Sequence, residues 1–449
     1  MARLMALAGQ LQRRALRSRE LIERALARIA DPAGEGARTF LRVYAAQARA
    51  QADAVDLLRE AGASLPPLAG VPVSVKDLFD VAGEVTTAGS QVLRSRSAAT
   101  QDAEVVSRLR RAGLIVVGRT NMTEFAYSGL GINPHYGTPR NPFERAAARI
   151  PGGSSSGAAV SVSDEMAAGA LGTDTGGSCR IPAALTGLVG FKPTACRVPL
   201  EGVLPLSPTL DSVGPLGTTV ECCALLDAVI AGESLSAPAP WPLRGLRLLA
   251  PRTLVQDELE TAVAARFGHA FDELARAGVC IVSDALEELH ALPEINAKGG
   301  FSAAESYTAY GELLARHPEQ VDPRVAVRIL KGREQSAADY VRLRQAREQL
   351  IARLQQRTAP YDALIMPTVP RVAPRLEELQ SDTDYFRANS LMLRNPAIAN
   401  FLDRCAISLP IQEPGTAPIG LMLVGEHRAD RRLLAIARSI EALLSPPAR

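Results

Sequence analysis

Two short motifs rich in glycine and serine lie close together near the middle of this 449-residue chain. The first reads IPGGSSSG over residues 150–157 and the second reads GTDTGGSCR over residues 172–180, so Ser154 and Ser178 stand 24 positions apart. Segments of this composition usually form flexible linkers. The residues around them are small and apolar, however, which favours a buried helix packed closely on a sheet. We therefore interpret the two motifs as ordered loops that together form one active site.

The elements expected before the motifs alternate between strand and helix. Alternating valines over residues 71–75 predict a strand that ends at Lys76. Residues 101–112 are expected to form a helix, and residues 114–121 a continuously apolar strand of the buried parallel type. Strand, helix, strand in this order is typical of α/β proteins.

The second half of the chain continues this alternation. The expected strands are residues 246–251, 279–284, 362–367 and 419–425. A helix is expected over residues 257–277, several long helices from about 300 to 357, and a last helix over 430–444. Strands and helices are not segregated into separate regions of the sequence. We therefore expect an α/β fold with a mixed, largely parallel, twisted sheet surrounded by helices.

The length of the chain bounds its domain organisation. Single cores usually stop growing at ~250–300 residues, and the proline-rich segment 232–245 is either a domain boundary or a crossing loop. We expect a single domain over residues 1–449. It consists of two N-terminal helices (1–63), a core that carries the motifs (64–231), and a more variable half that completes the sheet and the substrate pocket (245–449).

The composition excludes several classes of function. A net charge of +2 provides no basic field that would favour nucleic acid or an anionic membrane as partner. No apolar stretch approaches the ~20 residues of a membrane span, and arginines interrupt the N-terminal apolar run too early for a signal peptide. The six cysteines form neither a C-x-x-C pair nor a zinc-type cluster with histidine, so we expect no metal, no cofactor and a cytoplasmic protein with reduced thiols.

Lys76, Ser154 and Ser178 are residue types that can perform acyl transfer together. A serine hydroxyl is a poor nucleophile until a base takes its proton. Lysine serves as that base when burial lowers its pKa from ~10.4 and leaves the amine neutral. Ser–Lys arrangements are a known variant of the serine triad. Only four of the 50 basic residues are lysines, which favours a specific role for Lys76.

The glycines beside Ser178 add a means of stabilising negative charge. They let the backbone approach a bound carbonyl closely. We expect the successive N–H groups of Thr175, Gly176, Gly177 and Ser178 to point at a developing oxyanion. Each such donor contributes roughly 2.7–4 kcal/mol to catalysis.

The stretch PGGSSSGAAVSVSDEMAAGALGTDTGGSCRIPAALTGLVGFKPT closely resembles the signature of the amidase signature family. That family includes fatty acid amide hydrolase, malonamidase and the A-type chain of the tRNA-dependent amidotransferases. The resemblance extends over most of the chain and includes PLAGVPVSVKDLFDVAGEVTTAGS, GLIVVGRTNMTEFAYS, YGTPRNP, LDSVGPL, YDALIMPTVP and PIGLMLVG. It implies the amidase signature fold and cleavage of a carbon–nitrogen bond at a carbonyl.

The resemblance also implies a role for each residue of the expected site. Ser178 would be the acylated nucleophile, Ser154 would relay the proton from a non-proline cis peptide, and Lys76 would be the ultimate base. Asp174 and Arg180 would form a pair that shapes the nucleophile loop without taking part in the chemistry.

Further positions match the family beside these catalytic residues. Ser155 matches a serine that supports the site from behind, and Tyr127 and Ser128 occupy a segment that borders the substrate in relatives. Two residues depart from the family pattern: Ser156 replaces a glycine, and Cys179 follows the nucleophile where isoleucine or valine is common. Neither touches a proposed catalytic atom, so we expect activity to be retained.

The expected substrate is a small or aryl amide, with carbamates, including urethanes, and anilides as related possibilities. In the family, specificity lies in the second half, here roughly residues 285–400. Its aromatic residues either line the pocket or pack in the core: Phe301, Tyr307, Tyr310, Tyr385 and Phe386. The sequence leaves the oligomeric state open between monomer and homodimer.

Two other functions remain open at this point. The A-type chain of the amidotransferases shares the same three residues and releases ammonia from glutamine for a partner protein. A Ser-His-Asp esterase is the second alternative, because GSSSG also fits the nucleophile elbow G-x-S-x-G with Ser155 at its centre. That motif needs a strand directly before it and a histidine from the later part of the chain, where His269, His290, His317 and His427 are available.

Overall fold

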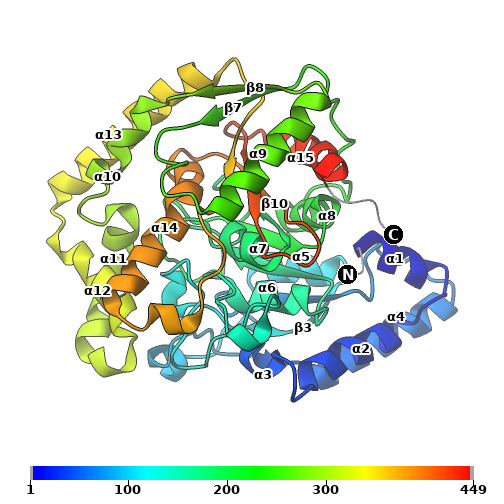
Figure 1. The fold of residues 1–449 in the computed structure, drawn as a ribbon. Helices are drawn as coiled ribbons and strands as arrows, with labels where there is room; N and C mark the ends of the chain where they lie inside the picture. Colours follow the sequence, from blue (N-terminus) through cyan, green and yellow to red (C-terminus); the bar gives the residue numbers. More distant parts are fainter. Residues whose placement is uncertain (1–3, 445–449) are drawn as a thin grey trace.

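The computed structural model describes residues 4–444 as one 11-stranded sheet enclosed by helices (Figure 1). The strands are β1 (Phe40–Val43), β2 (Pro72–Lys76), β3 (Ile115–Thr120), β4 (Gly169–Thr173), β5 (Val189–Lys192), β6 (Val213–Gly217), β7 (Arg247–Pro251), β8 (Cys280–Asp284), β9 (Ala363–Pro367), β10 (Ala406–Pro410) and β11 (Gly420–Val424). The helices are α1 (Leu4–Gln12), α2 (Ser18–Ala30), α3 (Gly36–Thr39), α4 (Ala45–Glu60), α5 (Glu104–Arg111), α6 (Ser156–Ser163), α7 (Arg180–Thr186), α8 (Val220–Ala231), α9 (Thr261–Arg276), α10 (Ala291–Ile295), α11 (Gly300–Arg316), α12 (Pro323–Leu330), α13 (Ala337–Thr358), α14 (Asp382–Phe401) and α15 (Asp430–Leu444).

The sheet is mixed, with the strand order β1-β3-β2-β4-β6-β5-β10-β11-β9-β7-β8. Neighbours run parallel at β2–β3, β2–β4, β7–β8 and β7–β9, and the other six pairings are antiparallel. The predicted α/β fold with a mixed sheet is confirmed, but the expectation of a largely parallel sheet is wrong. The unpredicted strands β1, β6 and β10 take part in five of the six antiparallel pairings. The loop between β10 and β11 is also too short for the crossover that a parallel pair requires.

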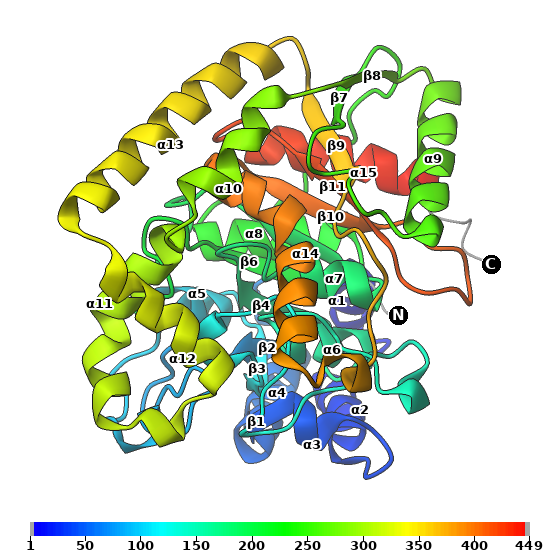
Figure 2. The ribbon, with the colours of Figure 1, turned by 60° about the vertical axis from the view of Figure 1, so that its left-hand side comes forward.

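Both faces of the sheet are covered by helices. Successive side chains of a strand point to opposite faces, and on β11 Leu421 and Leu423 pack with α8, α9 and α15, whereas Met422 and Val424 pack with α13 and α14. Figure 2 shows α14 crossing in front of the strands, with α8 and α15 behind them. The strands of the sheet centre are therefore buried on both sides.

The N-terminal region differs from the expected pair of helices. The second predicted helix is interrupted by β1, in which Phe40 pairs with Thr120 of β3. The sequence FLRV of β1 contains aromatic and β-branched residues, which favour a strand. Helices α2 and α4 lie side by side at this end of the molecule (Figure 1).

The fold brings the two Gly/Ser motifs to one edge of the sheet. Strands β2 and β4 are parallel neighbours, with Val75 opposite Leu171, so their carboxyl ends meet. Lys76 ends β2 and Thr173 ends β4. The first motif leads directly into α6 and the second into α7. Polar loops at the carboxyl ends of strands are a usual location for sites in α/β proteins.

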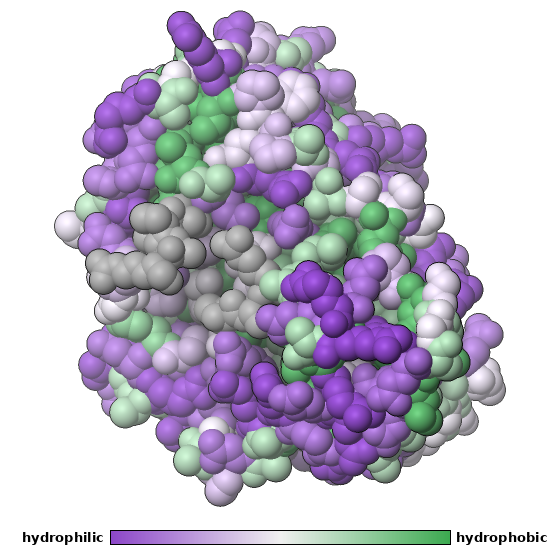
Figure 3. All heavy atoms as spheres, turned by 90° about the vertical axis from the view of Figure 1, so that its right-hand side faces the viewer, coloured by the Kyte–Doolittle hydropathy of each residue, from purple (hydrophilic) through white to green (hydrophobic). Residues whose placement is uncertain are grey.

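Within the described part of the chain, no helix combines the length and the apolar character that a membrane crossing needs. The face of the molecule shown in Figure 3 is mainly hydrophilic, with apolar residues in small separate areas. Scattered exposed apolar residues of this kind are normal for a protein surface.

Candidate active site

Lys76 is fully buried at the end of β2. Its Nζ lies 2.7 Å from Oγ of Ser154 and 2.8 Å from Oγ1 of Thr173. No carboxylate forms an ion pair with Lys76 among residues 4–444. Burial lowers the pKa of Lys76 from its ordinary 10.5 to about 8, against a smaller opposing effect of nearby acidic groups. The amine is therefore poised to exchange a proton with a hydroxyl near neutral pH.

The loop that carries Ser154 is ordered and fully buried, and the peptide bond between Gly153 and Ser154 is cis. The N–H of Gly153 donates to the carbonyl of Gly129, and the carbonyl of Ser154 accepts from the N–H of Thr123. A side chain at position 153 would collide with the backbone of Gly131, since its Cβ would lie 2.5 Å from that nitrogen. The first motif is thus a fixed part of the core rather than a linker.

Asp174 and Arg180 form a buried ion pair that organises the loop carrying Ser178. The Nε and Nη2 of Arg180 donate to the two carboxylate oxygens at 3.0 and 2.8 Å. The N–H groups of Gly177 and Cys179 donate to the same carboxylate, as does the amide of Asn400 on α14. Although burial raises the pKa of Asp174, the charge and hydrogen bonds of Arg180 outweigh it and hold that pKa below its usual range. The pair therefore fixes the backbone around Ser178.

The structure changes the expected set of oxyanion donors. The N–H of Gly177 points to Asp174 at 2.8 Å and is not available to a substrate. Gly177 has a φ of +129°, and a Cβ there would lie 2.6 Å from the Cβ of Pro396, so only glycine fits this turn. The N–H groups of Thr175, Gly176 and Ser178 donate to no other residue in the described chain. These three remain the candidate donors, and the prediction for Gly177 is corrected.

Ser178 faces a cavity, and its hydroxyl has no hydrogen-bond partner among residues 4–444. Its carbonyl accepts from the N–H of Ser155, which links the two motif loops at 3.3 Å. The hydroxyl of Ser155 lies against the carbonyl of Thr173 at 3.4 Å, behind the site. The structure thus joins Lys76 to Ser154 directly and leaves the Ser178 hydroxyl free toward the cavity.

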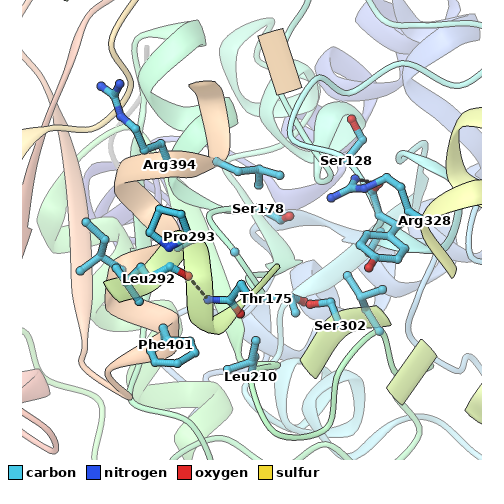
Figure 4. A pocket seen from close by; sticks show the side chains of 18 of the residues that line it. Ser128, Thr175, Ser178, Leu210, Leu292, Pro293, Ser302, Arg328, Arg394 and Phe401 are labelled. Atoms are coloured by element: carbon cyan, nitrogen blue, oxygen red, sulfur yellow. Dashed lines mark hydrogen bonds between the residues drawn. The ribbon is translucent and has the colours of Figure 1, made fainter. Parts of the chain in front are cut away.

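The cavity in front of Ser178 has a volume of about 290 Å³ (Figure 4). Tyr127 and Ser128 lie in its wall. Many of the other lining residues are apolar: Leu206 and Leu210 come from the first half of the chain, and Leu254, Leu292, Pro293, Leu393, Ala397, Ile398 and Phe401 come from the second. The wall also contains two arginines, Arg328 of α12 and Arg394 of α14.

A model of the amidase family matches residues 20–434, which is most of the chain. This chain belongs to the amidase family. It is 41% identical over 403 residues to the 2-amino-5-chloromuconic acid deaminase of Comamonas testosteroni, covering 89% of this chain and 87% of that relative. It is 36% identical over 463 residues to the mandelamide hydrolase of Pseudomonas putida, covering 96% and 89%.

Two further comparisons concern an amidotransferase chain and a solved structure. The chain is 34% identical over 456 residues to the A-type chain of the glutamyl-tRNA(Gln) amidotransferase of Symbiobacterium thermophilum, covering 93% of this chain and 92% of that relative. A crystal structure described as an amidase superposes with a TM-score of 0.89 at 31% identity, over 99% of this chain and 100% of the other. The family and fold expected from the motifs are therefore confirmed.

The aromatic residues considered for the amidase pocket do not line it. Phe301, Tyr310 and Tyr385 are buried in the core, where they contact other side chains. Tyr127 and Phe401 are the aromatic residues of the cavity wall within the described chain. Phe401 ends α14, which showed no distinctive sequence motif.

The esterase alternative gains no support from the geometry of this amidase. No strand directly precedes Ser155, which lies behind the cavity rather than in its wall. No histidine of the described chain lines the cavity, and His269 and His427 lie beside carboxylates elsewhere. Nor do residues 4–444 contain a cluster of three His, Cys, Asp or Glu side chains arranged to hold a metal ion.

Three residues of the amidase site were not among those predicted. The hydroxyl of Thr173 accepts a hydrogen bond from the amine of Lys76, as does that of Ser154. Asp211 accepts a hydrogen bond from the hydroxyl of Thr175, beside the candidate oxyanion donors. Burial raises the pKa of Asp211 to about 6. Both residues lie inside motifs that the sequence displays, GTDTGGS and LDSVGPL, so their positions could have been noticed. Asn400 has no such signal, because only folding brings α14 to Asp174.

Proposed function

We propose that this member of the amidase family hydrolyses an amide through an acyl-enzyme on Ser178, with Ser154 as proton relay and Lys76 as base. The single observation that carries the proposal is the environment of Lys76. Burial of an amine with two hydroxyl partners and no carboxylate makes its neutral form, which is the form a base requires, far more accessible than in an exposed lysine.

In the first half-reaction, the amide carbonyl lies in the cavity beside Ser178. The hydroxyl of Ser178 turns toward Ser154 and passes its proton there, while Ser154 passes its own proton to Lys76. Catalytic hydrogen bonds often tighten in this way only in the substrate complex. The Ser178 oxygen bonds to the carbonyl carbon, and the N–H groups of Thr175, Gly176 and Ser178 stabilise the oxyanion.

Collapse of this intermediate breaks the carbon–nitrogen bond. The proton held by Lys76 returns through Ser154 to the leaving nitrogen, so ammonia or an amine departs and Ser178 carries the acyl group as an ester. Water then attacks the ester and gives a proton to Lys76 through Ser154. The carboxylic acid leaves, and Ser178 regains its proton.

The proposed substrates are small or aryl amides, with carbamates and anilides as further candidates. The apolar wall and the modest volume of the cavity support this choice. A relative named for mandelamide, an aryl amide, supports it as well. Carbamates and anilides belong in the proposal because the same attack at a carbonyl carbon cleaves their carbon–nitrogen bonds.

A hydrolysis screen with the purified chain tests this function. Ammonia or amine release is measured from aliphatic amides, aryl amides, anilides, carbamates and glutamine. We expect turnover of at least one amide and complete loss of activity in Ser178→Ala. In Ser154→Ala and Lys76→Ala we expect kcat to fall at least 100-fold, because removing any one member of a proton-transfer chain interrupts the whole chain. Near-normal rates in Lys76→Ala would reject the mechanism.

A second candidate function is the hydrolysis of glutamine as the A-type chain of an amidotransferase complex. The 34% identity to such a chain over most of both sequences favours it. Activity restricted to glutamine, together with copurification of a partner protein, would support this alternative. Turnover of simple amides by the isolated chain would reject it.

We also propose that the enzyme works in the cytoplasm as a monomer or a homodimer. All six cysteines are free thiols, and four of them are buried, which suits a reducing compartment. Size-exclusion chromatography with light scattering distinguishes the two oligomeric states.

A further inference from the structure

Arg328 extends from α12 into the wall of the cavity. Figure 4 shows its guanidinium directed toward the space in front of Ser178. The group stacks on the ring of Tyr127, with its central carbon 4.1 Å from the ring centroid, and its Nη1 donates to the carbonyl of Tyr127. These two contacts fix the guanidinium at the cavity surface.

The charge of Arg328 is not neutralised by the protein. Arg328 forms no ion pair with a residue of the described chain, and its Nε and Nη2 donate to no described residue. The cavity wall contains no aspartate or glutamate. A guanidinium edge that is fixed, charged and without an acceptor in a mainly apolar cavity is suited to an anion that enters with the substrate.

Arg394, the other arginine of the wall, also forms no ion pair with a described residue, but its donors are engaged by the protein. Its Nη2 donates to the carbonyl of Asp257 at 2.7 Å, and its Nε donates to the side chain of Asn395 at 3.0 Å. In Figure 4 its guanidinium points away from Ser178. The donor edge of Arg394 is therefore occupied by the protein, and that of Arg328 is not.

We propose that the substrate is an amide whose acyl group carries a carboxylate, and that Arg328 is the residue that selects it. This inference rests on the proposed amide hydrolysis at Ser178. With a primary amide, only ammonia leaves, so the acyl group is the part of the substrate that fills the cavity. Its carboxylate accepts two parallel hydrogen bonds from Nε and Nη2 of Arg328, while its carbon chain contacts the leucines of the wall.

Paired substrates of equal size test this selection. Succinamate, glutaramate and adipamate carry one carboxylate and one amide, and succinamide, glutaramide and adipamide replace that carboxylate with a second, neutral amide. Ammonia release gives kcat/KM for each compound. We expect the wild-type enzyme to prefer at least one carboxylate over its neutral counterpart by roughly 10- to 100-fold, the range of a hydrogen-bonded charged pair.

Variants of Arg328 separate binding of the carboxylate from general damage to the enzyme. In Arg328→Gln we expect this preference to vanish, because kcat/KM falls at least tenfold more for the carboxylate substrate than for the diamide. Arg328→Lys should keep part of the preference, since the charge remains but the planar donor edge is lost. Arg324→Gln is the matched control: Arg324 lies one turn earlier on α12, pairs with Asp382 and does not line the cavity, so the preference should be unchanged.

Two results would overturn the proposal. One is a wild-type enzyme that prefers the diamides or turns over only amides without a carboxylate. The other is an equal loss on both substrates in Arg328→Gln, which would make Arg328 a structural residue. Failure of the proposed function itself is distinguishable, because the wild-type enzyme would then hydrolyse no amide of any kind.

Discussion

Lys76 ends its strand with the amine inside the protein, where two hydroxyls face it. A charged amine at this position costs free energy because it has lost its water and gained no counter-charge. The pKa of about 8 in the folded chain, against an ordinary 10.5, expresses that cost. Since the protonated form is the one that burial penalises, Lys76 lowers stability most at low pH and less as the pH rises.

Lys76→Met is therefore expected to abolish activity and to stabilise the fold at pH 7. A difference of 2.5 pKa units corresponds to a gain of up to about 3 kcal/mol. The gain should shrink to below about 1 kcal/mol at pH 10, where the folded wild type already carries a neutral amine. Urea unfolding at the two pH values measures it.

Lys298→Met is the control for this comparison, because Lys298 is exposed and pairs with Asp339 at the surface. It should change neither activity nor the pH dependence of stability. A stabilisation by Lys76→Met that is the same at pH 7 and pH 10 would contradict a pKa lowered by burial.

At the scale of elements, three buried asparagines of α14 form hydrogen bonds with separate segments around the site. Asn389 accepts from the hydroxyl of Ser128 and the N–H of Gly129. Asn395 donates to the carbonyls of Val255 and Pro367, and Asn400 reaches Asp174. One helix thus positions the segment around Ser128, the end of β9 and the loop that carries Ser178.

Asn389→Leu is expected to loosen the substrate-bordering segment. It leaves the N–H of Gly129 buried without an acceptor, which costs about 1–3 kcal/mol of stability. We expect KM to rise at least fivefold with a smaller change in kcat, because Ser128 borders the cavity and does not carry the reaction. Steady-state kinetics and thermal unfolding measure both effects.

Arg387→Ala, an exposed change on the same helix, should alter neither quantity. A fall in kcat at unchanged KM in Asn389→Leu would place this segment in the chemistry instead.

The elements also differ in how far the sequence predicts them. Strands β2, β3, β7, β8, β9 and β11 follow from apolar alternation or short apolar runs, as do helices α5, α9 and α15. Strand β10 could not be predicted, because a five-residue apolar segment after a long helix has the same pattern as a continuation of that helix. Its position between β5 and β11 depends on partners from both halves of the chain.

The site shows the same division between local and long-range information. Lys76, Ser154 and Ser178 lie in motifs that local sequence displays, and the ends of β2 and β4 bring two of these motifs together. Part of the cavity wall comes from α10, α12 and α14, which have no motif, so Arg328 and Phe401 could be assigned to it only from the fold.

At the scale of the whole molecule, one sheet joins both halves of the chain. Strand β10 pairs with β5 from the first half and with β11 from the second. One apolar layer combines residues from α8, α9 and α15. This continuity supports the proposed single domain, in which Lys76, Ser154 and Ser178 come from the first half and the cavity beside Ser178 is built largely from the second.

A single domain predicts one unfolding transition. Trp241, the one tryptophan of the chain, lies in the proline-rich segment between the halves, where Arg432 of α15 stacks on its ring at 5.1 Å. We expect tryptophan fluorescence and far-ultraviolet circular dichroism to change at the same temperature, within about 2 °C. Two separated transitions would show that the halves unfold as independent domains.

The most direct test of the catalytic assignment is the rate at which a fluorophosphonate labels the enzyme as a function of pH, with the modified residue identified by peptide mass spectrometry. The account predicts that Ser178 is labelled, that the rate rises as the pH passes through about 8, and that Lys76→Met removes the labelling. Labelling of Ser155, or a Ser178 rate that is independent of both pH and Lys76, would contradict it.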